Sequence, residues 1–150
     1  MANTYTKLHY HIVFSTKNRV PWIKEDLEQR VWEFLGGIAR KNGATALQVG
    51  GIEDHVHVVA ATPPTLAISK LLQLLKGGSS TWANETIPRL KGFAWQDGYS
   101  AFSVSASNLP AVIQYVKTQR EHHRQRTFQD EYKTLLAKHG IEFDEQYVWG

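Results

Sequence analysis

The run from Glu53 to Val59 constrains the fold of this chain more than any other stretch. It is rich in valine and lies between a double glycine and a double proline, a pattern that predicts a short β-strand. Side chains on a strand alternate between its two faces, so His55 and His57 share one face while Val56 and Val58 point into a core on the other. Two neighbouring imidazoles can bind one metal ion, or they can be exposed histidines on the wet face of an antiparallel sheet. The pair alone leaves both interpretations open.

Hydrophobic periodicity places this strand within a longer series of elements. A second amphipathic helix begins at Thr65, and the two glycines and two serines of 77–80 interrupt or end it. The turn residues of 96–98 predict a hairpin between two short strands. The predicted order is a strand over Tyr5–Thr16, a helix over Lys24–Lys41, a strand over Ala44–Gly50, the histidine strand, the second helix and a strand pair within 93–105.

This order is typical of an α+β fold with helices on one face of an antiparallel sheet, as in ferredoxin-like and RRM-like domains. Beyond it, Asn108 can cap a third helix. Tyr115 and Gln119 are four residues apart on that helix, so they lie on one face about one turn apart. A last helix follows Thr127 and ends at a glycine. The acidic tail over 141–150 ends in aromatic residues, which we expect to pack on the body of the protein or on a partner.

Length and composition exclude several classes of protein. A chain of 150 residues is the size of one domain, spanning 1–150. The absence of cysteine excludes disulfides, thiolate metal sites and cysteine nucleophiles. No apolar run approaches the roughly eighteen residues of a membrane span, and the first fourteen residues are too polar for a signal peptide. We therefore expect a soluble cytoplasmic protein without a membrane partner.

The net charge of +3 hides an uneven distribution. Residues 70–126 hold eight Lys and Arg against three Asp and Glu, whereas residues 127–150 hold two against five. A basic middle segment is typical of a surface that binds a polyanion, although it can also be a solvated face. Six of the seven histidines form close pairs, at 9 and 11, 55 and 57, and 122 and 123.

Tyr115 and Gln119 complete a set of residues suited to phosphodiester chemistry. Ionising a tyrosine at pH 7 costs about 4 kcal/mol, because its pKa is near 10. A cation held by the histidine pair would polarise a phosphate and orient it for attack by the phenol, giving a phosphotyrosine that conserves the bond for rejoining. Gln119 offers a third, oxygen ligand. Tyr115 can equally be a core aromatic and Gln119 a surface residue.

Four blocks of the sequence resemble motifs of the single-tyrosine HUH transposases of the IS200/IS605 insertion sequences. These are His55-Val56-His57 after Glu53-Asp54, the stretch Leu71–Gly77 with Ser79-Ser80, the stretch Trp95–Val104, and the stretch Tyr115–Arg124. The opening stretch Tyr10–Lys17 also fits the first strand of this family. The resemblance covers the chain from about Tyr5 to Trp149, in order and at compatible spacing. Ser100 stands where the family often has glycine, outside the catalytic set.

The resemblance implies a divalent-metal transposase that cuts and rejoins single-stranded DNA at insertion-sequence ends through a 5′-phosphotyrosine. It implies that His55, His57 and Gln119 are metal ligands and that Tyr115 is the nucleophile. The strand of His9 and His11 is not the family's metal strand. Ligand softness alone suits zinc or manganese as well as magnesium, and the resemblance implies Mg²⁺ or Mn²⁺.

The family also implies the partners of the protein. They are single-stranded DNA hairpins at the element ends, in the bacterial or archaeal nucleoid, and a second copy of the chain in a homodimer with composite active sites. Lys and Arg neutralise phosphates and Ser can hydrogen-bond to them. The expected DNA contacts are Lys70, Lys76, Ser79, Ser80, Arg89, Lys91, Arg120 and Arg124.

Two other functions are compatible with the sequence. One is a non-catalytic or domesticated single-stranded-DNA-binding protein that acts on palindromic repeats, for which the basic segment is the reason. The other is a metal-dependent phosphoesterase that uses water in place of Tyr115, and only the histidine pair supports it. Cleavage that depends on Tyr115 separates the transposase from both.

Overall fold

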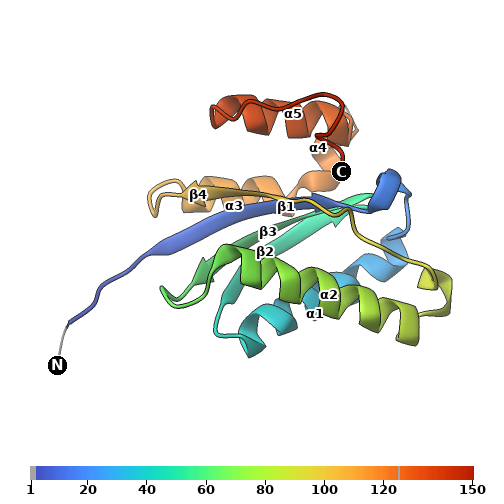
Figure 1. Ribbon diagram of the computed structural model, residues 1–150, viewed down its shortest axis with the longest axis horizontal. Coiled ribbons are helices and arrows are strands. Elements are labelled where there is room, and N and C mark those ends of the chain that lie inside the picture. Colours follow the sequence, from blue (N-terminus) through green and yellow to red (C-terminus); the bar gives the residue numbers. More distant parts are fainter. Residues whose placement is uncertain (1–2, 125) are drawn as a thin grey trace.

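The fold is an antiparallel sheet with helices on both faces, seen in a computed structural model that describes residues 3–124 and 126–150 (Figure 1). Among these residues no helix is both long enough and apolar enough to cross a bilayer. The elements in chain order are β1 (Leu8–Ser15), the 3-10 turn η1 (Lys17–Arg19), α1 (Glu25–Lys41), β2 (Thr45–Ile52), β3 (His55–Thr62), α2 (Ile68–Thr86), the 3-10 turn η2 (Pro88–Leu90), β4 (Ser100–Val104), α3 (Leu109–Lys117), α4 (Gln119–His122) and α5 (Phe128–Lys138).

The four strands lie in the order β2-β3-β1-β4, and every neighbouring pair is antiparallel. With α1 between β1 and β2 and α2 between β3 and β4, this is the ferredoxin-like arrangement. The predicted fold is confirmed. The two central strands, β1 and β3, pair so that Val13 lies opposite His57 and Ser15 opposite His55.

Each face of the sheet is covered by different helices (Figure 1). On one face, Ile12 and Phe14 of β1 and Val56 and Val58 of β3 pack in the main core with α1 and α2. The prediction of helices on one face holds for α1 and α2, but α3, α4 and α5 lie against the other face. There a second core joins strand residues to α5, and its buried members are Val13, Phe102, Phe128, Tyr132 and Leu136.

Two predicted interruptions are wrong. Helix α2 runs through 77–80, because glycine in a helix interior costs only about 1 kcal/mol and buried residues anchor the helix on both sides, Leu72 and Leu75 before this stretch and Ala83 after it. Gly78 also allows α1 to approach, since a Cβ at this position would lie 2.9 Å from Ile38 Cδ1. The turn residues of 96–98 do not form a hairpin. Trp95 instead bridges to Thr16 beside β1, and Gln96 Oε1 accepts a hydrogen bond from the Ser15 backbone N–H at 2.6 Å.

The C-terminal tail packs on the body of the protein, as predicted for its aromatic end. The Trp149 ring lies 5.8 Å from that of Tyr132 and 6.5 Å from that of Phe128. The Arg19 guanidinium lies 5.4 Å from the Trp149 ring centroid. The tail thereby holds the start of α5 over the sheet.

Gly50 sets the distance between β2 and the tyrosine-bearing helix α3. A Cβ at this position would lie 2.1 Å from the Val116 carbonyl oxygen, so any side chain would push α3 away.

We expect Gly50→Ala to destabilise the protein by about 3 kcal/mol, the cost of overpacking a tight site. Gly77→Ala is the matched control, because nothing lies within 4 Å of a Cβ there. In urea unfolding Gly77→Ala should gain about 0.5–1 kcal/mol from helix propensity. Equal effects of the two substitutions would contradict this assignment.

Candidate active site

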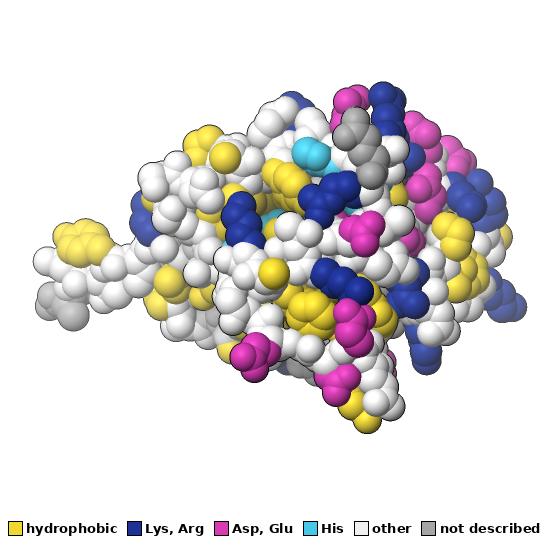
Figure 2. All heavy atoms as spheres, turned by 90° about the horizontal axis from the view of Figure 1, so that it is seen from above, with side chains coloured by type: hydrophobic (Ala, Val, Ile, Leu, Met, Phe, Trp, Pro, Cys, Tyr) yellow, Lys and Arg dark blue, Asp and Glu magenta, His cyan; other side chains and the backbone are white. Residues whose placement is uncertain are grey.

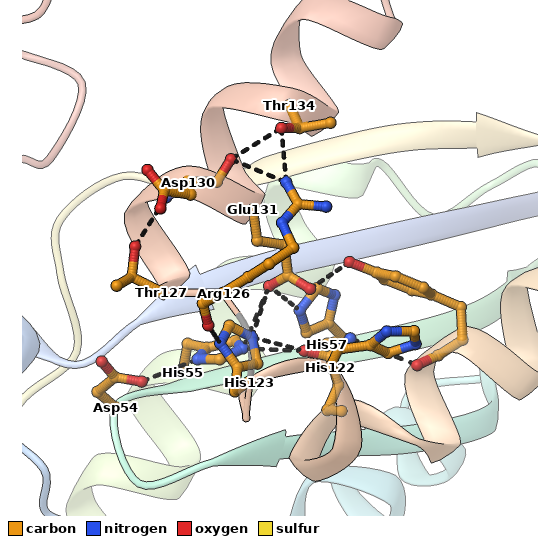
Figure 3. A network of polar contacts seen from close by, with 12 residues as sticks. Asp54, His55, His57, His122, His123, Arg126, Thr127, Asp130, Glu131 and Thr134 are labelled. Atoms are coloured by element: carbon orange, nitrogen blue, oxygen red, sulfur yellow. Dashed lines mark hydrogen bonds and ion pairs between the residues drawn. The ribbon is translucent and has the colours of Figure 1, made fainter.

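His55 and His57 lie fully buried on β3, on the face of the sheet covered by α3, α4 and α5. Strand alternation put them on one face as predicted, but the alternative of two exposed histidines is wrong. Both rings point toward a carboxylate that descends from α5, that of Glu131 (Figure 3). Glu131 Oε1 lies 3.1 Å from His57 Nε2 and 3.4 Å from His55 Nε2.

Gln119 joins this group from α4. Its side chain is buried, and its Oε1 lies 3.1 Å from both His55 Nε2 and His123 Nε2. His123 Nε2 also lies 3.1 Å from Glu131 Oε1. One strand, β3, and two helices far from it in sequence, α4 and α5, therefore bring two imidazoles, an amide oxygen and a carboxylate together.

The far nitrogen of each strand histidine is held by a different partner. His55 Nδ1 lies 2.9 Å from Asp54 Oδ1, and His57 Nδ1 lies 2.7 Å from His11 Nε2. Burial lowers the pKa of His11 to about 3, so its ring is neutral and its Nε2 can accept a hydrogen bond from His57 Nδ1. Both contacts fix ring orientation and leave Nε2 directed at Glu131, as is usual behind metal-binding histidines.

The cluster is strongly coupled electrostatically. Burial alone would lower the pKa of His55, but hydrogen bonds to Asp54 and Glu131 outweigh it and raise the pKa to about 9. Burial dominates at His57, whose pKa is lowered. Burial alone would raise the pKa of Glu131, but hydrogen bonds from His123, His55 and His57 hold it far below its usual value. Glu131 is thus a buried carboxylate balanced by imidazolium.

Tyr115 lies at the edge of the same cluster, with its hydroxyl donating to the second carboxylate oxygen of Glu131. Its ring centroid is 5.8 Å from that of His57 and 4.7 Å from that of His122. Burial, together with the negative charge of Glu131, raises the pKa of Tyr115. The phenol is therefore protonated at neutral pH and has a hydrogen-bond acceptor at hand.

The helix carrying Tyr115 differs from the prediction. It was expected to continue through Gln119, but α3 ends at Lys117 because Thr118 leaves the helical conformation, with φ −106° and ψ 30°. The Thr118 hydroxyl donates to the Gln114 carbonyl at 2.9 Å. Gln119 then begins α4 and still reaches the histidines. Of the two predicted caps, that of Asn108 is absent, because its side chain makes no capping hydrogen bond. The cap at Thr127 is present, since its hydroxyl accepts a hydrogen bond from the Asp130 backbone N–H.

The four predicted DNA contacts on α2 lie on the opposite face of the sheet from the histidine cluster. Lys70 is exposed and Ser80 half-buried. Ser79 is buried, accepting from Trp95 Nε1 at 2.8 Å, so its hydroxyl is not available to a phosphate and we exclude it as a DNA contact. Lys76 donates to the Asp97 and Gly98 carbonyls, and burial lowers its pKa.

The remaining predicted DNA contacts are four cations that differ in their ion pairs. Arg89 pairs with Asp26, whereas Lys91 is exposed. The Arg120 guanidinium forms ion pairs with the Glu28 carboxylate at 2.6 Å and the Glu53 carboxylate at 3.0 Å. The pair with Glu53 connects α4 to the turn before β3. Arg124 is exposed beside the cluster.

Sequence reasoning missed three residues of the cluster: Glu131, His123 and His11. Glu131 had a detectable signal, because a carboxylate three residues after Phe128 and four before Leu135 interrupts the apolar stripe of the last helix. His123 belongs to the adjacent histidine pair 122 and 123, whose spacing alone indicates no role. The link from His11 to His57 depends on strand pairing, which no local pattern displays.

The donor set fits a divalent cation. One ligand atom from each of His55, His57 and Glu131 lies within 4.8 Å of the others, all three residues being buried. Imidazole nitrogen suits zinc, copper, iron and nickel, and carboxylate or amide oxygen suits magnesium, calcium and manganese. Gln119 supplies a further oxygen beside His55.

Metal affinity should increase with pH in the range below about 9. A metal binds the neutral imidazole. Because the pKa of His55 is raised to about 9, its ring carries a proton below that pH, and this proton must be released when the metal binds. We expect the apparent affinity for Mn²⁺ to rise about tenfold per pH unit between 7 and 9 and then level off. Calorimetry in buffers of different ionisation enthalpy measures both the affinity and the released proton. An affinity independent of pH over this range would contradict the assignment.

Comparison with known proteins places these features in a family. A family model described as "Transposase IS200 like" matches residues 4–119. The ISDra2 transposase TnpA of Deinococcus radiodurans is 26% identical over 120 residues, covering 77% of this chain and 86% of that protein. The transposase for insertion sequence element IS200 of Salmonella typhimurium is 28% identical over 126 residues, covering 81% of this chain and 82% of that protein.

Two solved structures share the fold. A Deinococcus radiodurans protein assigned as a transposase superposes with a TM-score of 0.66 at 26% identity, covering 79% of this chain and 95% of that one. A REP-associated tyrosine transposase bound to a REP hairpin superposes with a TM-score of 0.61 at 13% identity, covering 82% of this chain and 73% of that one. Since the family model spans most of the sequence, the chain belongs to the IS200-like transposase family.

Proposed function

We propose that this transposase cuts and rejoins single-stranded DNA at insertion-sequence ends through a 5′-phosphotyrosine on Tyr115, assisted by Mg²⁺ or Mn²⁺. The observation that carries the proposal is the shared carboxylate. Glu131 contacts His55 and His57 through one oxygen and the Tyr115 hydroxyl through the other. A nucleophile and a group of metal ligands thus meet at one side chain.

His55, His57, Glu131 and Gln119 would hold the cation. When bound, it supplies positive charge that polarises the scissile phosphate and neutralises charge developing on it. Tyr115 supplies the nucleophile. Its oxygen forms a bond to phosphorus while the bond from phosphorus to the 3′ oxygen breaks, leaving a free 3′ hydroxyl and a 5′-phosphotyrosine.

The phenolic proton has a defined destination. The Tyr115 hydroxyl already donates to Glu131, so the proton can move along this hydrogen bond as the phenol attacks and then reach the departing 3′ oxygen. In rejoining, a 3′ hydroxyl attacks the phosphotyrosine, the bond from phosphorus to Tyr115 breaks, and the tyrosine is restored.

DNA hairpins at the element ends are the proposed partner, in the nucleoid. The relative bound to a REP hairpin supports a hairpin ligand, because it has the same fold. Arg124 is the proposed phosphate contact nearest the cluster, and the exposed cations of the other face extend the basic surface. These distal contacts are Lys70, Lys91 and Arg89, with Lys76 and Ser80 as partly covered candidates. Arg120, which follows Gln119 on α4, is a partly covered candidate near the cluster.

A homodimer with composite active sites is the proposed assembly. Tyr115 reaches the histidines of its own chain here, so an exchanged arrangement would require the helices after β4 to pass to a second copy. Mixing Tyr115→Phe with His57→Ala protein tests this point. Restored adduct formation in the mixture supports composite sites, and an inactive mixture of dimers supports sites built within one chain.

The experiment that tests the proposed function uses labelled single-stranded hairpins from the DNA flanking the gene. A covalent protein–DNA adduct that survives denaturing electrophoresis should form with Mg²⁺ or Mn²⁺ and not with EDTA. Hairpin binding without cleavage under either condition would instead identify a non-catalytic DNA-binding protein.

A further inference from the structure

A cavity of about 360 Å³ lies between α3 and α5, with β1 and β4 beneath it. Tyr115 and Glu131 line it, as does His11, so the phenol borders this hollow as well as the histidine cluster. The volume falls in the range of small-molecule sites, which begins at about 300 Å³. The proposed chemistry at the metal ligands does not use the rest of this space.

Part of the cavity wall is apolar, and these apolar side chains come from three different elements. Val104 ends β4, Val112 lies on α3 and Leu135 on α5. Apolar side chains of this kind can contact the face of any base, because every base has an apolar π-face. The cavity thus lies between α3 and α5, beside the second core that joins α5 to the sheet.

Polar groups line the cavity together with these walls. Asn108 and His139 both line it. The His139 ring stacks on Phe102, with centroids 4.1 Å apart and planes at 17°, and its Nδ1 lies 2.8 Å from the Leu135 carbonyl oxygen. This contact fixes the ring and leaves Nε2 for a ligand. An amide and an imidazole are the kinds of group that recognise the edges of a base.

Two cations, Arg126 and Lys138, also line the cavity. The Arg126 guanidinium is fixed by hydrogen bonds to Thr134 Oγ1 at 2.6 Å and to the Asp130 carbonyl at 3.2 Å (Figure 3). Arg126 and Tyr115 line the same cavity. A phosphate at the phenol would therefore lie within the field of a positioned arginine.

The surface around α5 combines positive charge with apolar side chains, as the cavity lining does. Figure 2, which looks down on this side, shows Lys and Arg side chains next to hydrophobic ones, with a histidine visible between them. Cations beside apolar surface are typical of sites that bind single-stranded nucleic acid.

Resting on the proposed function, we propose that this cavity binds the deoxynucleoside joined to the phosphate that Tyr115 attacks. A phosphodiester joins two nucleosides, each through one bond to the phosphorus, and the cavity begins at the phenol, so one of the two is within its reach. The groups that line this space combine apolar walls, hydrogen-bonding edges and positive charge. The helices α3 and α5 would thereby read one base beside the cleavage point.

The test uses single nucleotides, so it needs neither cleavage nor knowledge of the element. The full-length protein in Mg²⁺ is titrated by calorimetry with the four deoxynucleoside 5′-monophosphates, the four 3′-monophosphates and 2-deoxyribose 5-phosphate. At least one nucleotide should bind tenfold or more tightly than the base-free sugar phosphate. The 5′ and 3′ series show which side of the scissile phosphate the cavity holds.

Two variants on α3 localise the base. Val112→Phe fills the cavity and should bind every nucleotide no more tightly than deoxyribose phosphate, whereas Gln114→Phe, on the exposed side of α3, should retain the wild-type preference. Equal binding of nucleotides and sugar phosphate by the wild type would overturn the proposal, as would an unchanged preference in Val112→Phe. Failure here with a normal covalent adduct refutes the cavity alone, and loss of the adduct with normal nucleotide binding refutes the proposed chemistry alone.

Discussion

Replacing Tyr115 by phenylalanine should abolish the covalent protein–DNA adduct, with a loss of at least about 10⁴-fold in the rate of strand cleavage, as for removal of other enzyme nucleophiles. The ring remains, so its packing against His57 and His122 persists and only the attacking oxygen is lost. The measurement is a time course of adduct and cleaved strand on a denaturing gel, with DNA labelled at each end in turn.

Tyr147→Phe is the matched control, because Tyr147 is 70% exposed in the C-terminal tail, and it should cleave at the wild-type rate. Cleavage by the Tyr115→Phe protein that persists without adduct but disappears in His57→Ala would identify a metal-dependent phosphoesterase that uses water. That outcome would remove Tyr115 from its proposed role and leave the metal site intact.

Replacing Glu131 by glutamine should have the second large effect. In EDTA the variant should lose about 3 kcal/mol of unfolding free energy, because a buried carboxylate is removed from the imidazoles that neutralise it. It should also bind Mn²⁺ at least about tenfold more weakly, since an anionic ligand becomes neutral. Urea unfolding and calorimetry measure the two effects, and Glu121→Gln is the exposed control on α4.

The stability difference between wild type and Glu131→Gln should depend on pH with a definite sign. The Glu131 pKa is lowered in the folded state, so its contribution is present above the ordinary value of 4.5. The His55 pKa is raised from 6.5 to about 9, so its contribution is complete below 6.5 and is lost as the pH rises through 9. The difference should therefore be largest between about pH 4.5 and 6.5. A difference that grows above pH 9 would contradict this pairing.

Local sequence patterns were sufficient for the fold and for part of the site. Alternation in β3 put His55 and His57 on one face, and helical spacing put Tyr115 and Gln119 near each other, because both patterns depend only on neighbouring residues. The partners of these side chains were not predictable in the same way. Glu131 reaches the histidines through the docking of α5 on the sheet, which depends on contacts across the whole chain.

The wrong predictions arise where contacts between distant parts of the chain override a local sequence pattern. Glycines in 77–80 read as a break, but tertiary packing of α2 against α1 overrides their low helix propensity. The turn signal at 96–98 is genuine turn chemistry, yet Gln96 and Gly98 are held by β1 and by the C-terminal Gly150 rather than by a partner strand. The sequence favours Ser79 as a phosphate contact, because no local pattern shows that its hydroxyl accepts a hydrogen bond from Trp95.

The most direct test of the account is to identify the amino acid that carries the DNA. The adduct formed with Mn²⁺ is digested with nuclease and protease, and the peptide that retains a nucleotide is sequenced by mass spectrometry. The account predicts a 5′-linked nucleotide on Tyr115 and on no other residue. A nucleotide on Tyr99, on Tyr147 or on a serine would contradict it.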